Sequence, residues 1–347
     1  MAGFRLTFRR LELQAVNPWK LSRTKPSRSA EVVICELTDD AGNIGRGEAA
    51  PVARYGESAE TVQQFLSRIN PQNLGDDPWA ISAQLDSIAS GNFTAKGAIE
   101  VALWDWFGKV NQKTVSQLLG LNFKERTHRT SFTIGIDSPE VIRTKVIEAE
   151  KFPILKIKVG SANDTDNLAA LRAVAPEKII RADANEAWTT KEEALKHIEA
   201  LARDGRIEFV EQPMPARTPE RDWIWLKKRS PLPIFADESH HDAADVDRAA
   251  ERFHGVNVKL VKTAGISGAF KALQAARRAG LKTMLGCMLE TGVLISAAAQ
   301  LAELCDYLDL DGNLLIANDP FCGVTADRGI LSFENAPEPF GIRVCPK

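Results

Sequence analysis

The chain has 347 residues, 44% of them hydrophobic, so it can bury a large core and is too apolar to be disordered. Its 44 Lys and Arg residues nearly balance its 46 Asp and Glu residues, which gives a net charge of -2. That balance excludes the basic surface of a nucleic-acid-binding protein or of a protein drawn to an anionic membrane, and it favours a small-molecule partner.

Cysteine usage and the start of the chain predict a cytoplasmic protein. The start is interrupted by Arg5, Arg9 and Arg10 before a signal-peptide core could form, and no uncharged stretch reaches the length of a membrane span. The five cysteines form no CxxC pair and show no zinc-type spacing with histidine: Cys35, Cys287, Cys305, Cys322 and Cys345. We therefore expect reduced thiols.

The first third of the chain predicts a separate α+β unit. FRLTFRRLEL (4–13) and AEVVICELTD (30–39) have the composition of strands, and the turn signal DDAGNIG (39–45) follows the second. A small antiparallel sheet is expected there. Thr94 is predicted to cap an amphipathic helix over TAKGAIEVALWDWFGKV (94–110), because apolar residues recur along it at helical spacing.

From about residue 130, short apolar strands alternate with helical stretches. The polar residues that end five successive strands stand at positions 158, 183, 211, 237 and 259, a spacing that fits one strand, one helix and two short loops. This pattern predicts an α/β fold, a parallel (β/α)8 barrel of the TIM type. The eight predicted strands are RTSFTIGI, PILKIKVG, KIIRADAN, RIEFVEQP, LPIFADES, GVNVKLVK, KTMLGCMLE and CDYLDLD.

The two-residue period of a strand separates these segments into an apolar face and a charged face. Apolar residues belong against the surrounding helices, so the charged face must point into the barrel mouth, where barrel enzymes place their active sites. Each charged motif alone has an ordinary structural explanation. Six consecutive strand ends that each place a charged residue on the same face have no such explanation. The charged face comprises Lys156, Lys158, Arg181, Asp183, Asn185, Glu211, Asp237, Ser239, Asn257, Lys259, Asp309 and Asp311, with Phe209, Phe235 and Tyr307 on the same side.

The residue types on this face indicate metal-assisted proton transfer. Asp183, Glu211 and Asp237, on three consecutive strands, are hard oxygen ligands with no histidine or cysteine nearby, which suits Mg²⁺ or Mn²⁺. Lys158 and Lys259 flank them, so one lysine could remove a proton beside a metal-bound carboxylate and the other could return one to the opposite face. Because like charges lower a lysine's pKa, Lys156 beside Lys158 and Lys262 near Lys259 are expected to help.

Together these motifs resemble the enolase superfamily, in its muconate-lactonizing subgroup, over nearly the whole chain. The resemblance rests on KxK (156–158), DAN (183–185), EQP (211–213), ADES (236–239) and NVKLVKTAG (257–265). GRGEAAP (45–51) and AKGAIEVALWDWFGK (95–109) are similar to that group's capping domain. The resemblance implies a capping domain of residues 1–123, completed by the tail 320–347, over a barrel of residues 124–319. It also implies that loops near residues 17–28 and 51–58 close over the barrel.

The resemblance assigns roles to individual residues. It implies Mg²⁺, with Mn²⁺ as a substitute, bound by Asp183, Glu211 and Asp237, and Lys158 and Lys259 as the acid/base pair. Supporting positions are Lys156, Asn185 and Glu290. Members of this family commonly associate, so a homo-oligomer is left open.

The DLD segment at 309–311 distinguishes among members of the subgroup. Two carboxylates on one face of the eighth strand would bind a cation, and the chain here resembles dipeptide epimerases, in which a DxD holds the substrate's α-ammonium group. The resemblance implies a two-base 1,1-proton transfer through a metal-stabilised enolate at the α-carbon of the second residue, as in L-Ala-D/L-Glu, and a place in peptidoglycan recycling. Arg23 lies where Ala-Glu epimerases carry an arginine that meets the glutamate side chain. Thr133 and Glu290 are expected to shape the pocket.

Two other functional classes stay open at this stage. An o-succinylbenzoate synthase, an N-succinylamino acid racemase or a muconate-type cycloisomerase would use the same metal and lysines, but Asp309 and Asp311 would repel the anionic distal end of such substrates. A non-catalytic binding protein or a Schiff-base lysine enzyme could share the barrel, but the intact set of metal ligands argues against both.

Overall fold

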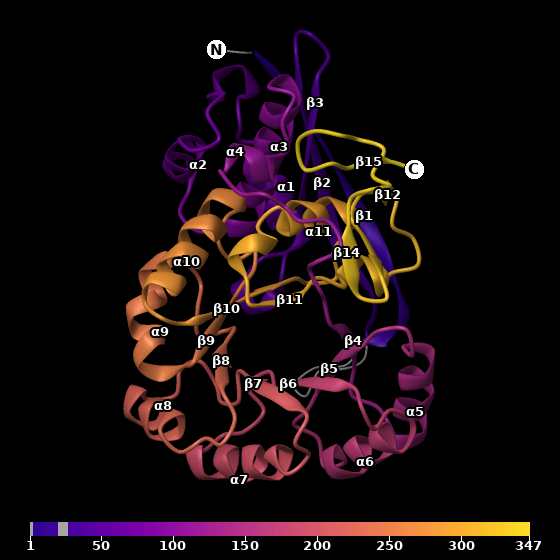
Figure 1. Cartoon of the computed structure of the whole chain (residues 1–347). Coiled ribbons are helices and arrows are strands. Elements are labelled where there is room, and N and C mark those ends of the chain that lie inside the picture. Colours follow the sequence, from indigo (N-terminus) through magenta and orange to yellow (C-terminus); the bar gives the residue numbers. More distant parts are fainter. Residues whose placement is uncertain (1–2, 20–26) are drawn as a thin grey trace.

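The computed structural model describes residues 3–19 and 27–347, which form an upper unit of antiparallel strands and helices above a parallel barrel (Figure 1). The upper unit contains a sheet in the order β1-β2-β3, with both strand pairs antiparallel. Its elements are β1 (Phe4–Trp19), β2 (Ser27–Asp39), β3 (Ile44–Ala49), α1 (Ala59–Leu66), α2 (Ile81–Ile88), α3 (Phe93–Val110) and α4 (Val115–Leu118). The expected antiparallel sheet is therefore present.

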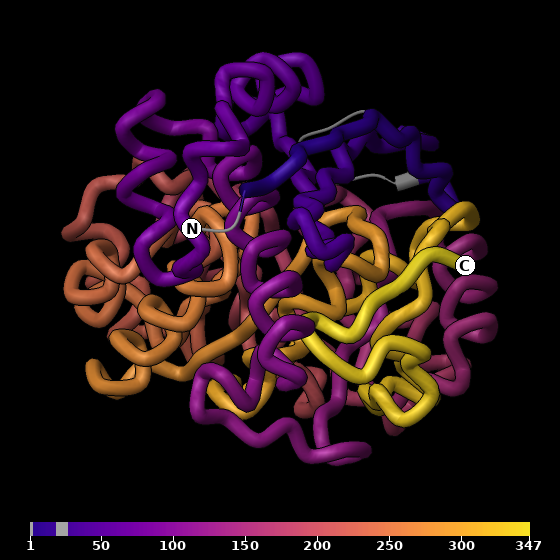
Figure 2. Tube along the Cα trace, turned by 90° about the horizontal axis from the view of Figure 1, so that it is seen from above, coloured from indigo at the N-terminus to yellow at the C-terminus, as the bar shows by residue number. Residues whose placement is uncertain are grey.

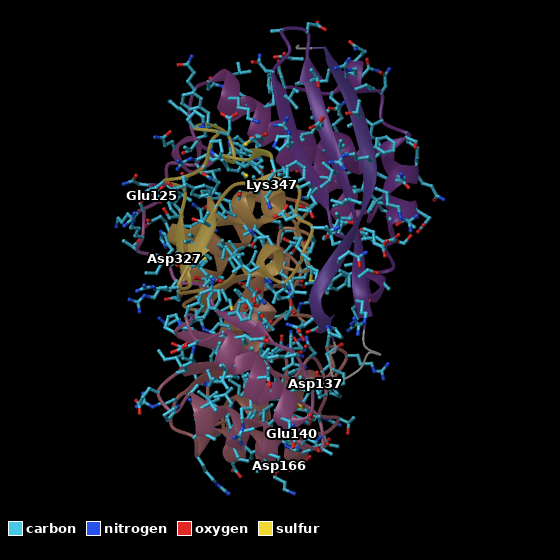
Figure 3. All side chains as sticks on the ribbon, turned by 90° about the vertical axis from the view of Figure 1, so that its right-hand side faces the viewer. Glu125, Asp137, Glu140, Asp166, Asp327 and Lys347 are labelled. Atoms are coloured by element: carbon cyan, nitrogen blue, oxygen red, sulfur yellow. The ribbon has the colours of Figure 1, made fainter. Side chains whose placement is uncertain are left out.

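The alternation of residues along β1 and β2 explains how this unit packs. Phe4, Val33, Cys35 and Leu37 point to one side of the sheet and form a buried cluster with apolar side chains of α1, α2 and α3. The other end of β1 leaves this cluster and runs down to the barrel (Figure 3), where the backbone N–H of Val16 donates to the carbonyl of Leu315 (2.9 Å). The sheet thus connects the two units.

The start of helix α3 differs from the prediction. The helix begins at Phe93 after Asn92, so Thr94 lies inside the first turn and is not the cap. The carboxylate of Glu57 takes that place: it accepts hydrogen bonds from the backbone N–H of Thr94 (3.2 Å) and from the Thr94 hydroxyl. A negative charge at this end is favourable because the free N–H groups there carry partial positive charge.

The barrel has eight parallel strands in the order in which they occur along the chain, which confirms the predicted TIM-type fold. A parallel bridge between Thr130 and Leu308 joins its first and last strands, and the N–H of Ser131 donates to the Leu308 carbonyl (3.1 Å). The strands are β4 (Phe132–Ile134), β5 (Ile154–Lys158), β6 (Ile179–Asp183), β7 (Ile207–Glu211), β8 (Ile234–Ala236), β9 (Gly255–Val258), β10 (Lys282–Gly286) and β11 (Tyr307–Asp309).

Helices follow the strands and surround the barrel (Figure 1). The expected (β/α)8 pattern is wrong at its last unit: in the described chain, β11 is followed by the short 3-10 turn Gly312–Leu314 and not by an α-helix, because the chain returns there to pair with β1. The helices are α5 (Pro139–Glu148), α6 (Asp164–Val174), α7 (Lys191–Ala202), α8 (Glu220–Lys227), α9 (Val246–Arg252), α10 (Ile266–Arg278) and α11 (Gly292–Ala299). No helix in the described ranges combines the length and apolar character that crossing a membrane requires.

An aromatic layer inside the barrel fixes which residues face inward. The rings of Phe209 and Phe235 stack with centroids 4.2 Å apart, and Tyr307 meets Phe209 edge-on at 5.1 Å. Met284 completes this buried cluster. Because side chains alternate along a strand, the residues two positions further on, including Glu211, Asp237 and Asp309, also face the interior, nearer the carboxyl ends of the strands.

The C-terminal segment packs against both units. Its strands are β12 (Phe321–Cys322), β13 (Thr325–Asp327), β14 (Ile330–Ser332) and β15 (Cys345–Pro346), and Figure 2 shows this yellow segment beside the purple helices. The N–H of Ile342 donates to Asp105 of α3 (3.0 Å). Gly341 precedes it with φ 64°, and a Cβ there would lie 2.2 Å from Asp105 Oδ1, so the close approach requires glycine.

Two buried glutamates of the upper unit attach it to the barrel. Glu48 of β3 accepts hydrogen bonds from the N–H (2.9 Å) and hydroxyl (2.6 Å) of Thr291, just before α11. Glu100 of α3 accepts from the N–H groups of Ile266 and Ser267, both at 2.7 Å, at the start of α10. Each carboxylate therefore satisfies N–H groups that a helix start leaves free.

The Glu48 contact predicts a pH-dependent stability. Burial raises the pKa of Glu48 to about 7, from 4.5 for an ordinary glutamate. Between these values the folded protein keeps a proton that the unfolded chain has lost, so this group makes the free energy of unfolding fall as the pH rises. Glu48→Gln should remove that term. Relative to wild type, the variant should gain about 3 kcal/mol between about pH 4 and about pH 8 in urea unfolding.

A matched control for this experiment is Glu199→Gln, because Glu199 is exposed and lies away from the start of α7. The free energy of unfolding of this control variant should run parallel to that of wild type at every pH. A Glu48→Gln curve that also runs parallel to wild type would show that the pKa of Glu48 is the same in the folded and the unfolded protein.

Candidate active site

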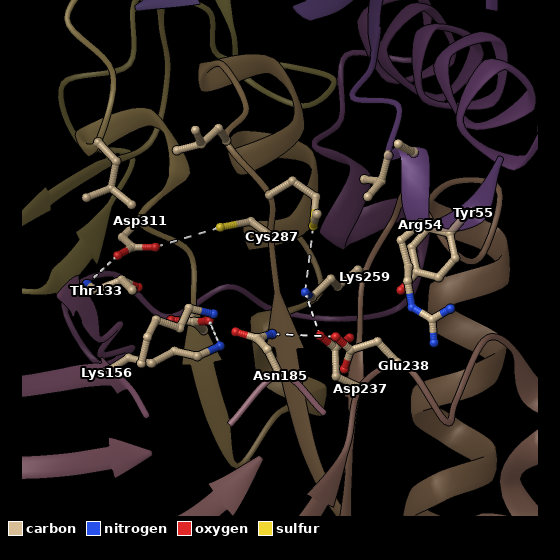
Figure 4. A pocket seen from close by; sticks show the side chains of 17 residues that line it. Arg54, Tyr55, Thr133, Lys156, Asn185, Asp237, Glu238, Lys259, Cys287 and Asp311 are labelled. Carbon is tan, nitrogen blue, oxygen red and sulfur yellow. Dashed lines mark hydrogen bonds and ion pairs between the residues drawn. The ribbon is translucent and has the colours of Figure 1, made fainter. Parts of the chain in front are cut away.

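A cavity of about 250 Å³ lies where the upper unit meets the carboxyl ends of the barrel strands (Figure 4). The upper unit contributes the segment 52–55, within the loop that was expected to close over the barrel. The barrel contributes most of the predicted polar residues: Thr133, Lys156, Lys158, Asn185, Asp237, Lys259, Asp309 and Asp311. The two-residue period of the strands therefore located this cavity correctly.

The three predicted metal ligands lie at adjacent strand ends and are almost completely buried. Asp183 and Glu211 are direct neighbours in the β6–β7 ladder, and Asp237 follows β8. Lysine ammonium groups lie against all three. Lys156 Nζ is 2.7 Å from Glu211 and 3.1 Å from Asp183, and Lys158 Nζ is 2.7 Å from Asp183.

The far side of the triad is held by two further lysines. Lys259 donates to Asp237 Oδ2 (2.9 Å), and Lys262 donates to Asp237 Oδ1 (2.7 Å). Lys262 also donates to the carbonyls of Asp237 (2.7 Å) and Asn257 (3.0 Å), so its fully buried ammonium group uses all three protons. Lys262 therefore fixes the orientation of the Asp237 carboxylate.

The donor set fits a small divalent cation. With the lysines so placed, no three Asp, Glu, His or Cys side chains among residues 3–19 and 27–347 converge as a ready-made metal site. The chemistry nevertheless suits one, because three buried carboxylates on neighbouring strands provide hard oxygen ligands. Charge favours it too, since six carboxylates outnumber four lysines: Asp183, Glu211, Asp237, Glu238, Asp309 and Asp311 against Lys156, Lys158, Lys259 and Lys262.

The expected lowering of the lysine pKa values is wrong for Lys259. Burial alone would lower the pKa of Lys259, but the adjacent Asp237 carboxylate outweighs it and raises the pKa. Lys156 behaves likewise: burial opposes its charge, and the carboxylates that it contacts raise its pKa well above the usual value. Lys156 is thus a fixed positive charge, and opposite charges at contact distance dominate over the more distant like charges.

The two aspartates of the DLD segment have different surroundings. Asp309 accepts from Lys156 Nζ (2.7 Å) and from the Ser131 hydroxyl (2.7 Å). Asp311 accepts from the Thr133 N–H (2.6 Å) and lies 3.8 Å from Cys287 Sγ (Figure 4). Among the described residues, no lysine or arginine forms an ion pair with Asp311.

These surroundings move the two pKa values in opposite directions. Burial favours the neutral form of Asp309, but Lys156 outweighs burial and lowers the pKa. Burial, followed by the neighbouring Asp309, raises the pKa of Asp311 to about 7. Asp311 is therefore the carboxylate that a ligand cation would stabilise most.

The capping loop brings Arg54 and Tyr55 to the cavity (Figure 4). Arg54 donates to Glu186 (2.7 Å), which follows β6, so it links the loop to the barrel rim. The Tyr55 ring meets His241 edge-on with centroids 5.3 Å apart. The sequence indicated the loop at 51–58 but not these side chains, because a single arginine or tyrosine in a loop carries no periodic signal.

The remaining predicted site residues divide into three groups. Thr133 and Asn185 line the cavity, and Asn185 Nδ2 lies 3.5 Å from Glu238. Glu290 is buried but is not among the described lining residues; its carboxylate accepts from the Met288 N–H (2.8 Å), and burial, reinforced by Glu48, raises its pKa to about 8. Arg23 lies in residues 20–26, outside the described residues.

Two residues that organise the site had no predicted role. Asn257 Nδ2 donates to Glu211 Oε1 (2.7 Å), and Gln212 Oε1 accepts from the N–H groups of Asp237 (2.9 Å) and Ser239 (3.1 Å). Asn257 stands two residues before Lys259 on the predicted inner face, and Gln212 is the middle residue of EQP. The positions of these two residues in the sequence thus pointed to the site, but their hydrogen-bond partners could be identified only from the fold.

Family models match both parts of the chain. Residues 141–315 match the enolase C-terminal domain-like family, and residues 6–120 match the N-terminal domain of the mandelate racemase / muconate lactonizing enzyme family. The L-Ala-D/L-amino acid epimerase of Pedosphaera parvula is 55% identical over 339 residues, which cover 97% of this chain and 98% of that protein.

Solved structures agree with the family models. The substrate-liganded L-Ala-D/L-Glu epimerase from Bacillus subtilis has a TM-score of 0.88 and 29% identity, with 96% of each chain covered. The dipeptide epimerase from Enterococcus faecalis, complexed with Mg and L-Leu-L-Tyr, has a TM-score of 0.89 and 31% identity, with 99% of each chain covered. These matches confirm the resemblance seen in the sequence motifs: the chain belongs to the enolase superfamily, in the mandelate racemase / muconate lactonizing enzyme family.

Proposed function

We propose that the protein is a Mg²⁺-dependent dipeptide epimerase that inverts the α-carbon of the C-terminal residue of dipeptides such as L-Ala-D/L-Glu. The observation that carries this proposal is Asp311, a buried carboxylate with no ion-pair partner among the described residues, in the same cavity as Lys158 and Lys259. The relatives described above, an L-Ala-D/L-amino acid epimerase and a dipeptide epimerase, support it.

Asp183, Glu211 and Asp237 would hold the metal ion. Bound there, Mg²⁺ supplies positive charge that offsets the negative charge developing on the substrate carboxylate when the α-proton leaves. Lys262 and Asn257 keep two of these carboxylates in place through the hydrogen bonds described above. Lys156 adds a fixed positive charge between the metal ligands and the DLD segment.

Lys158 and Lys259 would move the protons. They stand on opposite flanks of the acidic triad, one against Asp183 and the other against Asp237. One lysine, in its neutral form, accepts the α-proton from one face of the substrate, and the other, in its ammonium form, donates a proton to the opposite face. Asp237 raises the pKa of Lys259, but a divalent cation held by Asp237 would counter that effect with its positive charge and so favour the neutral form of Lys259. The reverse reaction exchanges the two roles, so each stereoisomer is deprotonated by a different lysine.

The other end of the substrate would bind at the DLD segment. The α-ammonium group of the first residue pairs with Asp311, while Asp309 is held mainly by Lys156 and Ser131. Substrates of an o-succinylbenzoate synthase, an N-succinylamino acid racemase or a muconate-type cycloisomerase lack this cation. Their anionic end would lie near the Asp311 carboxylate, and the repulsion between the two negative charges disfavours their binding.

Metal removal tests the chemistry of this proposal. Treatment with EDTA should abolish the interconversion of L-Ala-L-Glu and L-Ala-D-Glu, measured by chiral chromatography, and added Mg²⁺ or Mn²⁺ should restore it. N-succinylamino acids are the comparison substrates and should not racemise at a comparable rate. Activity that survives EDTA and is trapped by borohydride would instead support Schiff-base chemistry. Racemisation of N-succinylamino acids alone would favour the second functional class.

A further inference from the structure

Two of the five cysteines lie directly opposite each other in the C-terminal segment. Strands β12 and β15 are antiparallel, and their register pairs Cys322 with Cys345 (β12 and β15 are labelled in Figure 1). The pairing continues through Phe321 and Pro346 to the Lys347 N–H, which donates to the Pro320 carbonyl (2.9 Å). Both cysteines are free thiols, and both are partly exposed.

The spacing of such a pair suits a covalent bond. Opposite residues of an antiparallel pair have Cα atoms about 4.5 to 5.5 Å apart, which falls within the range that a disulfide spans. The pKa of the Cys345 thiol also reflects this proximity. Burial raises it most, and the neighbouring Cys322 raises it further. The other three cysteines lie elsewhere, Cys35 in β2, Cys287 after β10 and Cys305 before β11, and provide internal controls.

We propose that Cys322 and Cys345 are a redox modification site that forms a reversible disulfide with a low-molecular-weight disulfide as oxidant. One cysteine thiolate attacks the small disulfide and expels its first thiolate, which leaves a mixed disulfide on the protein. The second cysteine thiolate then attacks the protein sulfur and expels the second small thiolate. The two thiol protons end on the expelled thiolates, the two cysteines are oxidised and the small disulfide is reduced. In a reducing cytoplasm the pair stays reduced.

The bond would fasten the tail where it joins the two units. On one side, β12 is anchored to α11, because Asp319 accepts hydrogen bonds from the N–H groups of Phe321 (3.0 Å) and Gly292 (2.9 Å). On the other side, β15 closely follows Ile342, whose N–H donates to Asp105 of α3. A Cys322–Cys345 disulfide therefore closes a covalent loop of residues 322–345, which contains the Ile342 contact with α3. This inference is independent of the proposed activity.

The test uses the wild-type protein and oxidised glutathione. After oxidation and denaturation, the number of thiols that react with iodoacetamide should fall from five to three. A proteolytic peptide that links Cys322 to Cys345 should appear in the mass spectrum and disappear after reduction. The thermal unfolding midpoint should rise by about 5 °C in the oxidised form, because the cross-link restricts the unfolded chain.

Two variants complete the test. Cys305→Ser keeps the pair, so it should still lose two thiols and show the same linked peptide. Cys345→Ser should stop at a glutathione adduct on Cys322, without a linked peptide. The proposal is overturned if wild type keeps five reactive thiols, or if it only accumulates glutathione adducts under conditions in which a control dithiol peptide closes. The wild-type measurement decides the question by itself, so the test remains valid even if a variant folds poorly.

Discussion

Replacing Lys158 by alanine should stop exchange of the α-proton from one stereoisomer of the dipeptide, and Lys259→Ala should stop it from the other. The reason is that the two lysines lie on opposite flanks of the acidic triad, so each can reach only one face of the α-carbon. Epimerisation needs both lysines and should fall by about 10²- to 10⁴-fold in either variant. The measurement is solvent deuterium exchange into L-Ala-L-Glu and L-Ala-D-Glu, followed separately by NMR.

Lys282→Ala is the matched control for these variants. Lys282 lies at the opposite end of a barrel strand, and its side chain is 59% exposed and pairs with Asp306, so its loss should leave both exchange rates unchanged. Circular dichroism should verify that the site variants fold, because each leaves a buried carboxylate without one of its partners. If one lysine variant loses exchange on both faces and the other loses none, the two-base mechanism is wrong.

Asp311→Asn should raise the KM for dipeptides far more than the KM for N-acylated analogues that lack the ammonium group. Removing one partner of a buried charge pair costs enough binding energy for a change of about 10²-fold. Asp309→Asn should have a smaller selective effect, because Asp309 already pairs with Lys156. The double variant should show the full loss. Steady-state kinetics on matched pairs, such as L-Ala-L-Glu and N-acetyl-L-Glu, measure the difference.

Ser131→Ala provides a control within the same network. It removes the hydroxyl that donates to Asp309 but leaves both carboxylates in place, so it should change the two KM values alike. Equal increases for dipeptides and N-acylated analogues in Asp311→Asn would mean that Asp311 does not bind the ammonium group.

The strand ends show how much the sequence can predict. The barrel strands alternate strictly, so the inner positions of Lys158, Glu211 and Asp309 follow from a period of two residues and from the family motifs. The missing last helix was not predictable in the same way. The chain after β11 pairs with β1, which is about 300 residues away in sequence, and no local pattern encodes such a contact.

Contacts between residues far apart in the sequence account for the other differences between prediction and structure. Thr94 has the local signature of a helix cap, yet Glu57 takes over because the loop before α1 brings its carboxylate to the helix start. The direction of the Lys259 pKa shift depends on which charge lies nearest: Asp237, 22 residues earlier in the chain, contacts Lys259 Nζ at 2.9 Å and raises the pKa, against the lowering effects of burial and of Lys156. The distances between charged groups in the folded protein decide the direction of such pKa shifts, and the sequence does not reveal these distances.

The measurement that tests the proposed epimerase most directly is deuterium incorporation from D₂O into a library of L-Ala-L-Xaa and L-Xaa-L-Glu dipeptides with Mg²⁺ present, read by mass spectrometry. Label at the α-carbon of a subset, with L-Ala-L-Glu among the strongest, is the expected result and would also define the side-chain specificity. No label in any dipeptide, from folded protein that binds Mg²⁺, would contradict the assignment of Asp309 and Asp311 to substrate binding. N-succinylamino acids and muconates would then be the substrates to test.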